Sequence, residues 1–142
     1  MTIFLDANIL FSASDSKSAT RQLLEALATS HRLVTSVHAW EEARRNLERK
    51  RPHLLSGLNG LGSRIEITKA FEMPKERPEW LAEKDIPILA GAIGARCTHL
   101  WTSDRQHFGR LYGQRVQGLL VLSSIQMAQA YRDSTSSHSI QP

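Results

Sequence analysis

Four acidic residues are the side chains of this sequence best suited to catalysis, because each lies beside the end of an expected strand or the start of an expected helix. Asp6 directly follows a short apolar strand, and Asp104 follows another strand almost at once. Asp85 opens a helix, and Glu42 lies in the first turns of an earlier helix. In parallel sheets, functional groups gather outside the carboxyl ends of the strands. We therefore expect the four acids to meet at one edge of a sheet.

A cluster of carboxylates repels itself unless protons or a cation neutralise it. Oxygen ligands suit Mg²⁺ or Mn²⁺, which keep several waters and bind substrate phosphates. The sequence thus predicts a divalent metal site among these acids. Each acid also has a structural explanation: Asp6 can simply end a strand, Asp85 and Asp104 can cap helices, and Glu42, beside Glu41, can be a solvated helix residue.

The hydrophobic pattern alternates short strands with amphipathic helices, which predicts a parallel sheet covered on both faces. The expected strands are residues 2–5, 33–35, 65–68, 99–102 and 118–122. The expected helices are residues 18–30, 36–50 with Ser36 as its cap, 53–61, a helix from Asp85, a short piece up to Leu111, and 124–131. Residues 71–83 are expected to be a loop with a helical turn near Trp80. The predicted fold class is α/β, a three-layer α/β/α arrangement with a central, mostly parallel five-stranded sheet.

The chain length and composition fit one domain. With 142 residues, we assign residues 1–132 to the domain and expect a polar, disordered tail at 133–142. No apolar run approaches the roughly 20 residues that span a bilayer, so we expect no membrane association. The N-terminus lacks the basic region of a signal peptide, and Cys97 is the only cysteine, which together favour the reducing cytoplasm. The net charge of +4 fits a polyanionic partner but also suits many proteins without one.

Four segments resemble the PIN-domain nuclease family in the order LDANIL, TSVHAWEEARRNL, EKDIPILAGAIGARCTHLWTSD and RQHF. The similarity covers about Thr2 to Ile125. The family pattern is an aspartate after the first strand, a glutamate in the helix after the second, and two further aspartates. On this chain the pattern matches Asp6, Glu42, Asp85 and Asp104, and Glu42 is preferred to Glu41 because it lies six residues after Ser36.

The resemblance implies a ribonuclease that hydrolyses RNA phosphodiester bonds with bound Mg²⁺ or Mn²⁺. Asp6, Asp85 and Asp104 would hold metal, and Glu42 could orient the attacking water. Hydrogen bonds that fix these carboxylates are expected from Asn8, Thr102 and Ser103. RNA phosphates would meet a basic rim. The rim consists of Arg44, Arg45, Arg49, Lys50 and Arg51 on and after the helix of Glu42, with Arg105 and Arg110 after Asp104.

Small proteins of this family resemble the toxins of bacterial toxin–antitoxin pairs, which implies a cognate antitoxin and a homodimer. One departure concerns the further acid that many members carry shortly after Asp104, where this chain has Gln106, His107 and Phe108. The missing acid bears on whether a second metal ion binds. His107 could replace it as a ligand, but a lone histidine beside an aromatic residue is more often a packing or surface residue.

Two other functions remain as alternatives. A haloacid-dehalogenase-like phosphatase would need a second aspartate where this chain has Asn8. A catalytically weak PIN fold that binds RNA or supports assembly would be expected to lack the four acids.

Overall fold

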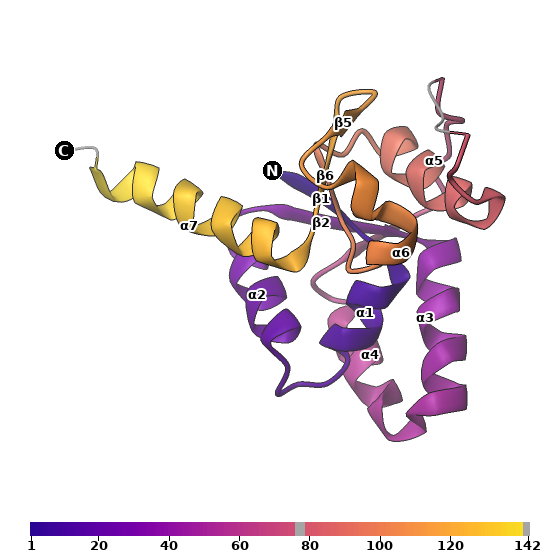
Figure 1. The fold of residues 1–142 in the computed structure, drawn as a ribbon. Helices are drawn as coiled ribbons and strands as arrows, with labels where there is room; N and C mark the ends of the chain where they lie inside the picture. Colours follow the sequence, from indigo (N-terminus) through magenta and orange to yellow (C-terminus); the bar gives the residue numbers. More distant parts are fainter. Residues whose placement is uncertain (76–78, 141–142) are drawn as a thin grey trace.

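A twisted, mostly parallel sheet forms the centre of the computed structural model, which describes residues 1–75 and 79–140 and the side chains of those up to residue 136 (Figure 1). The strand order is β3-β2-β1-β4-β6-β5. The strands are β1 (Thr2–Leu5), β2 (Arg32–Ser36), β3 (Glu66–Thr68), β4 (His99–Trp101), β5 (Arg115–Val116) and β6 (Leu119–Leu122). The predicted α/β class with a mostly parallel central sheet is confirmed.

The sheet has six strands in the described residues instead of the predicted five, because β5 pairs antiparallel with β6. The two strands are joined by Gln117 and Gly118, whose φ angles of 52° and 83° are both positive. Two-residue hairpin turns of this kind match the twist of the flanking strands, and glycine enters that conformation without strain. Gly118 therefore belongs to a turn, although the sequence analysis places it at the start of a strand.

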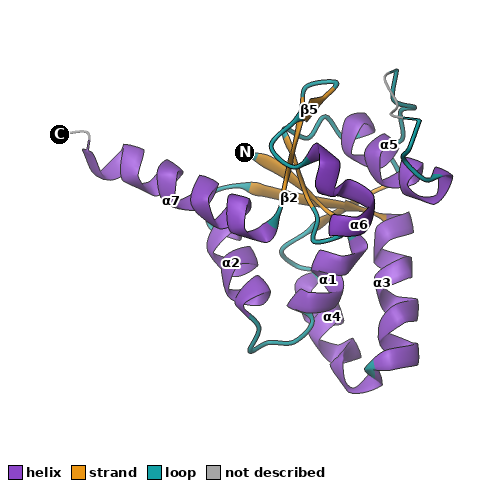
Figure 2. Ribbon diagram, in the orientation of Figure 1, coloured by secondary structure: helices purple, strands orange, loops and turns teal. Residues whose placement is uncertain are grey.

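Helices cover both faces of the sheet (Figure 2). Helices α1 (Ala7–Ala13), α2 (Ala19–Ala28), α3 (Val37–Lys50) and α4 (Leu55–Leu61) form a contiguous layer in which α1 contacts the other three. Helix α5 (Ile86–Gly94) packs on β2 and β4 from the opposite face. The remaining helical elements are η1 (Pro52–Leu54), η2 (Glu83–Asp85), α6 (Arg105–Phe108), η3 (Gly109–Leu111) and α7 (Ser124–Ile140).

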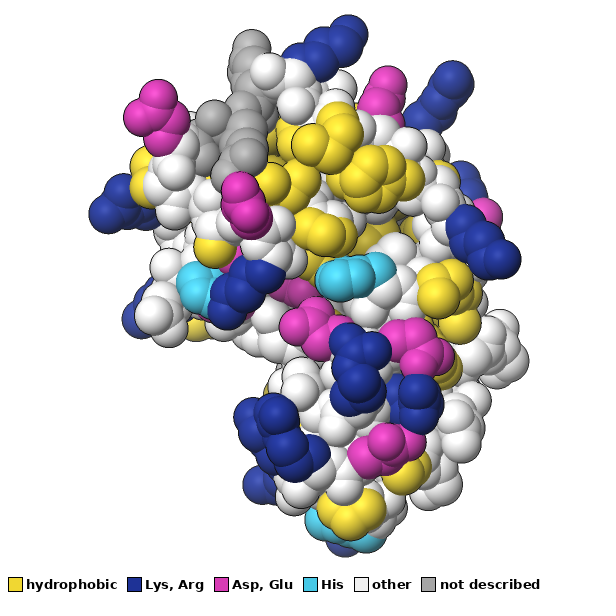
Figure 3. All heavy atoms as spheres, turned by 90° about the vertical axis from the view of Figure 1, so that its right-hand side faces the viewer, with side chains coloured by type: hydrophobic (Ala, Val, Ile, Leu, Met, Phe, Trp, Pro, Cys, Tyr) yellow, Lys and Arg dark blue, Asp and Glu magenta, His cyan; other side chains and the backbone are white. Residues whose placement is uncertain are grey.

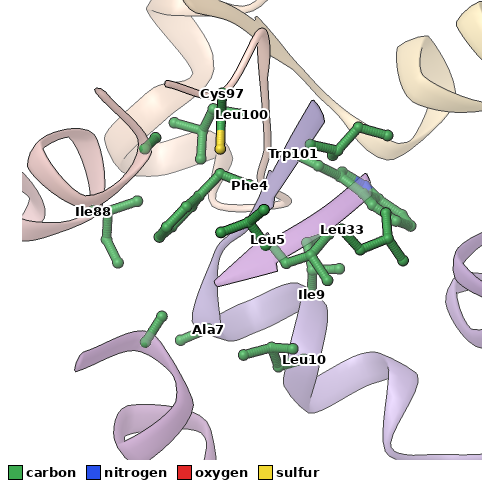
Figure 4. Close-up of a cluster of buried hydrophobic side chains, with 14 of the residues drawn as sticks. Phe4, Leu5, Ala7, Ile9, Leu10, Leu33, Ile88, Cys97, Leu100 and Trp101 are labelled. Carbon is green, nitrogen blue, oxygen red and sulfur yellow. The ribbon is translucent and has the colours of Figure 1, made fainter. Parts of the chain in front are cut away.

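The core lies on both sides of β1. Phe4 points towards Ile88 of α5, whereas Leu5 points towards Ile9 and Leu10 of α1 (Figure 4). This alternation follows from the two-residue period of a strand. Trp101 is fully buried, as expected for an aromatic residue in an apolar strand. Since β1 is covered on both faces, the residue that follows it enters an interior environment.

Helix α1 is missing from the elements predicted from the sequence. Its residues, ANILFSA, include four that are buried: Ala7, Ile9, Leu10 and Ala13. A seven-residue helix with apolar residues spread around it gives little periodic signal. The structure shows that Asp6 is its N-cap, with the Ala7 amide donating to Asp6 Oδ1 at 2.7 Å.

Helix α7 continues to Ile140, whereas the sequence analysis expects a disordered tail from Asp133. Local hydrogen bonds support the helix here: the Ser134 hydroxyl donates to the Tyr131 carbonyl at 2.7 Å, and the Thr135 hydroxyl donates to the Arg132 carbonyl at 2.9 Å. The difference arises because a polar composition indicates a lack of burial rather than a lack of helix. Residues 141–142 of the expected tail lie outside the described residues.

The segment from Phe71 to Glu83 has no strand or α-helix among its described residues and contains a turn at Trp80, as predicted. Residues 76–78 of this expected loop lie outside the described residues. Among the elements that the structure does describe, no helix combines the length and the apolar character that a membrane crossing requires.

The close contact between α4 and the end of α1 depends on Gly57. A Cβ atom added there would lie 1.8 Å from the carbonyl oxygen of Ser14, which is backbone and cannot rotate away. We expect Gly57→Ala to lower the free energy of unfolding by about 2 kcal/mol or more, measured by urea denaturation. Gly60→Ala in the same helix is the control, because its nearest atom is 3.9 Å away. That variant should be neutral or more stable, and equal destabilisation by both would contradict this packing.

Candidate metal centre

All four predicted acids line one cavity of about 290 Å³ at the carboxyl edge of the sheet. Asp6 follows β1, and Asp104 comes three residues after the end of β4. The chain proceeds from β1 outwards to β2 and β3 and then returns to place β4 on the other side of β1. Such a reversal opens a crevice between the two strand ends, where α/β proteins bind their ligands. Glu42 of α3 and Asp85 of η2 reach the same cavity from the two helical layers.

Asp6 is the most buried of these acids, with 4% of its surface exposed. Its Oδ1 atom accepts the Ala7 amide, and its Oδ2 atom accepts the Thr102 hydroxyl at 2.8 Å and the Asn8 amide group at 3.2 Å. Burial raises the pKa of Asp6 to about 6, and the charges of Glu42 and Asp104 add to that rise. The hydrogen bonds from Thr102 and Ala7 oppose it. Ionisation of Asp6 is therefore unfavourable in this site, because burial removes water from its carboxylate.

The residues expected to orient the carboxylates form a connected network. The backbone amide and the hydroxyl of Ser103 both donate to Asn8 Oδ1 at 2.9 Å, which leaves the Asn8 amide group free to face Asp6. The backbone amide of Asp104 donates to Thr102 Oγ1 at 3.1 Å, and the Tyr112 hydroxyl donates to the Thr102 carbonyl at 2.9 Å. Tyr112 is a member of this network that the sequence analysis does not identify.

Asp85, Asp104 and His107 form a second group within the site, with one ligand atom of each within 4.8 Å of the others. His107 Nδ1 lies 2.8 Å from Asp104 Oδ2 and 3.3 Å from Asp85 Oδ2. Neither approach has hydrogen-bond geometry, so Asp85 Oδ2 and His107 Nδ1 are buried without a hydrogen-bond partner among the described residues. Burial raises the pKa of Asp85, and the nearby charge of His107 opposes that rise.

Glu42 and Glu41 have different surroundings. Glu42 lines the cavity together with Asn46 and Lys50, which follow it at intervals of one helical turn. Glu41 instead accepts the Arg44 guanidinium, with Arg44 Nε at 3.1 Å, and this hydrogen bond lowers the pKa of Glu41. The geometry thus selects Glu42 as the glutamate of the cavity, in agreement with the choice made from the sequence.

Four arginines of the predicted basic rim lie in different settings. Arg44 bridges Glu41 and Glu48, with Nη1 at 2.6 Å from Glu48 Oε1. Arg49 donates to Asn46 Oδ1 at 3.2 Å, and Arg45 and Arg105 are exposed. Acidic and basic side chains are interspersed over the lower half of this face of the molecule, while hydrophobic side chains gather above them (Figure 3).

The residues present fit a divalent cation. Four carboxylates converge on a small cavity, and one buried oxygen, Asp85 Oδ2, has no hydrogen-bond partner among the described residues. A cation would supply the missing partner and neutralise the like charges. Asp6, Asp85 and Asp104 offer carboxylate oxygens, which suit Mg²⁺ or Mn²⁺. His107 adds a nitrogen to the same place.

His107 and Asn46 were not among the site residues predicted from the sequence, although His107 lies beside Asp104 and Asp85 and Asn46 lines the cavity. The sequence analysis expects His107 to be a packing or surface residue, but the structure places it half-buried between Asp104 and Asp85. Its position three residues after Asp104 was the available signal, because residues at that spacing share one side of a helix. Asn46 has the same kind of signal, four residues after Glu42, and Lys50 of the expected basic rim lies one turn further along the helix.

The structure combines a mostly parallel α/β fold with a group of acids at its strand ends, and the family comparison makes the class of protein specific. The family model "PIN domain" matches residues 3–114. The chain belongs to the PIN-domain family, whose members are generally nucleases. A comparison with curated protein sequences finds no match.

Solved structures share the fold at low sequence identity. One is the complex of VapBC2 from Rickettsia felis bound to a DNA fragment from their promoter, with a TM-score of 0.61 and 19% identity. Another is VapBC-1 from nontypeable Haemophilus influenzae, with a TM-score of 0.56 and 15% identity. In both cases the similarity covers 87% of this chain and 98% of the other. These structures support the three-layer arrangement around a parallel sheet.

The raised pKa of Asp6 predicts a pH dependence of stability. Its pKa is about 6 in the folded protein and 3.8 in an unfolded chain, so the folded state binds more protons between these two pH values. Stability from this group is therefore complete below about pH 4 and is lost as the pH rises through about 6. The Asp6→Asn variant lacks this titrating group, so its stability should not fall in the same way. In EDTA, we expect the difference in the free energy of unfolding between Asp6→Asn and wild type to shift by about 2–3 kcal/mol in favour of the variant from pH 4 to pH 7.

Urea denaturation at several pH values measures this difference, and Asp15→Asn, at a half-buried aspartate that does not line the cavity of the four acids, is the matched control. Parallel pH profiles of wild type and Asp6→Asn would contradict the assigned pKa.

Proposed function

We propose that this protein is a metal-dependent endoribonuclease that hydrolyses RNA phosphodiester bonds with Mg²⁺ or Mn²⁺. The observation that supports the proposal best is the convergence of four acids on one cavity in which Asp85 Oδ2 is buried without a hydrogen-bond partner among the described residues. An isolated charged oxygen in such a place is costly unless a cation meets it. Membership of the PIN-domain family supports the same assignment.

Each acid has a proposed role that follows from its surroundings. Asp6 is the most rigidly held ligand, because three donors fix its two oxygens. Asp85 and Asp104 complete the metal-binding set. A bound divalent ion would neutralise charge on the scissile phosphate and make a water molecule more acidic. Glu42, opposite on α3, orients that water and accepts its proton.

The RNA strand is proposed to lie along the groove between α1 and α3. The catalytic cavity is lined there by Phe11, Ser12, Asn46 and Lys50. A neighbouring hollow shares Phe11 and Ser12 and continues to Arg51. Lysine and arginine in such a groove attract phosphates, and an aromatic ring offers a stacking surface for a base.

The resemblance to toxins of toxin–antitoxin pairs extends the proposal to partners. We propose a cognate antitoxin and a homodimer, and the solved VapBC complexes of the same fold support an antitoxin. Large apolar side chains are exposed at the start of α3, on β3 and in the segment that follows β3, which supports a protein partner on that part of the surface. They are Val37, Ile67, Phe71 and Met73. Cytoplasmic location stays a prediction from the sequence.

Cleavage of RNA tests the proposed activity directly. We expect purified protein to cleave a mixed single-stranded RNA substrate with Mg²⁺ or Mn²⁺ and to lose activity in EDTA. Asp6→Asn, Asp104→Asn and Glu42→Gln should each reduce the rate by about 100-fold or more, because each removes a ligand or the group that orients water.

Glu41→Gln is the matched control for Glu42→Gln, since the two residues are adjacent on α3 but only Glu42 lines the cavity. Its rate should stay near that of wild type. Equal loss in the two glutamate variants would argue against the role of Glu42. A lack of cleavage together with a lack of Mn²⁺ stabilisation would favour a non-catalytic module that binds RNA or supports assembly.

The path of the RNA predicts unequal effects of two basic residues on α3. Lys50 lines the catalytic cavity, whereas Arg44 is already paired with Glu41 and Glu48. In the Asp104→Asn background, we expect Lys50→Gln to weaken binding of single-stranded RNA and to reduce the slope of log Kd against log salt by about 0.7–1. Arg44→Gln should change the slope less. Fluorescence anisotropy at several salt concentrations measures both, and a larger effect of Arg44→Gln would refute this path.

A further inference from the structure

We propose that the imidazole of His107 is a direct ligand of the metal ion held by Asp85 and Asp104, which makes the site prefer Mn²⁺ to Mg²⁺. This inference rests on the proposed function, because it concerns the same metal centre. His107 stands in the segment where PIN-domain relatives often carry a further acid. The imidazole nitrogen of His107 would therefore occupy the ligand position that a carboxylate oxygen of that acid would otherwise fill.

The distances in the site match those between neighbouring ligands of one ion. Two ligand atoms that lie at right angles about 2.1 Å from a shared ion are about 3 Å apart. His107 Nδ1 lies 2.8 Å from Asp104 Oδ2 and 3.3 Å from Asp85 Oδ2. The atoms thus have the spacing of ligands that bind the same ion.

The orientation of the ring also favours a shared ion over a direct hydrogen bond. A protonated Nδ1 would point its hydrogen straight at a carboxylate oxygen, yet neither approach meets hydrogen-bond geometry. Ligands of one ion instead point at the ion and lie to the side of one another. An ion at that place would satisfy both atoms that are buried without a hydrogen-bond partner among the described residues, Asp85 Oδ2 and His107 Nδ1.

The local backbone holds His107 in this position. Asp104 is the N-cap of α6, and its Oδ1 atom accepts the backbone amide of His107 at 3.1 Å. This bond leaves Asp104 Oδ2 on the side of the imidazole. Asp85 is 8% exposed and approaches from η2, so a buried carboxylate meets the half-buried side chains of Asp104 and His107.

The chemistry of the donor set predicts selectivity among metals. Mg²⁺ prefers oxygen ligands, whereas imidazole nitrogen suits transition metals, and affinity for mixed donors rises from Mn²⁺ to the later metals. A site of carboxylates alone would bind Mg²⁺ and Mn²⁺ more equally. We therefore expect wild-type protein to favour Mn²⁺ clearly, and His107→Asp to reduce the ratio of Mn²⁺ to Mg²⁺ affinity by about ten-fold or more.

Pulsed electron paramagnetic resonance of the full chain loaded with Mn²⁺ tests the ligand directly. We expect a coupling to imidazole ¹⁴N in the wild type and in the control His53→Asn, whose histidine is exposed on η1. The coupling should be absent from His107→Asp and His107→Asn. Bound Mn²⁺ without this coupling in the wild type would overturn the proposal and assign His107 as a protonated counter-ion instead.

Isothermal titration with Mn²⁺ and Mg²⁺ separates failure of this inference from failure of the proposed function. If Asp6→Asn and Asp104→Asn abolish Mn²⁺ binding while His107→Asp keeps the wild-type ratio of affinities, His107 is not a ligand but the metal centre stands. If none of these variants changes Mn²⁺ binding, both proposals are wrong. Urea denaturation in EDTA confirms that each variant is folded before its titration is interpreted.

Discussion

One hydrogen bond, from the Thr102 hydroxyl to the Asp6 carboxylate at 2.8 Å, joins the carboxyl ends of two strands that are neighbours in the sheet but 96 residues apart in the chain. It can form only because Leu5 pairs with Trp101, which brings the next residue of each strand side by side. Thr102 also accepts the backbone amide of Asp104. The register of β1 and β4 therefore fixes two of the four carboxylates at once.

This arrangement concentrates negative charge in a protein whose net charge is +4. Burial raises the pKa of Asp6 to about 6, and it raises the pKa of Asp85 as well. At neutral pH the folded chain bears the cost of ionised carboxylates that are close together and poorly solvated. A bound cation removes this cost, so cation binding and folding stability are linked through the same groups.

The sequence predicts the sheet and the acids well because both depend on local signals. The apolar strand before Asp6 and the cap at Ser36, which accepts the Ala39 amide at 3.0 Å, could be identified from residue type and spacing. Helix α1 could not, since its apolar residues show no period. For His107 the sequence offers only its spacing from Asp104, because Asp85, which lies 22 positions earlier, approaches it only in the folded chain. Residue spacing along the sequence does not reveal contacts between segments that are far apart in the chain.

Capping and metal binding are compatible roles for these aspartates, and the structure shows how. Asp6 and Asp104 each use Oδ1 to cap a helix, which fixes the carboxylate while Oδ2 faces the site. Asp85 makes no side-chain capping bond to α5, although it stands at the N-terminus of that helix. Helix capping therefore explains the positions of Asp6 and Asp104 but does not explain the burial of Asp85. Its Oδ2 atom lies buried beside His107 Nδ1 without a hydrogen bond among the described residues, so the functional interpretation of this site depends most on Asp85.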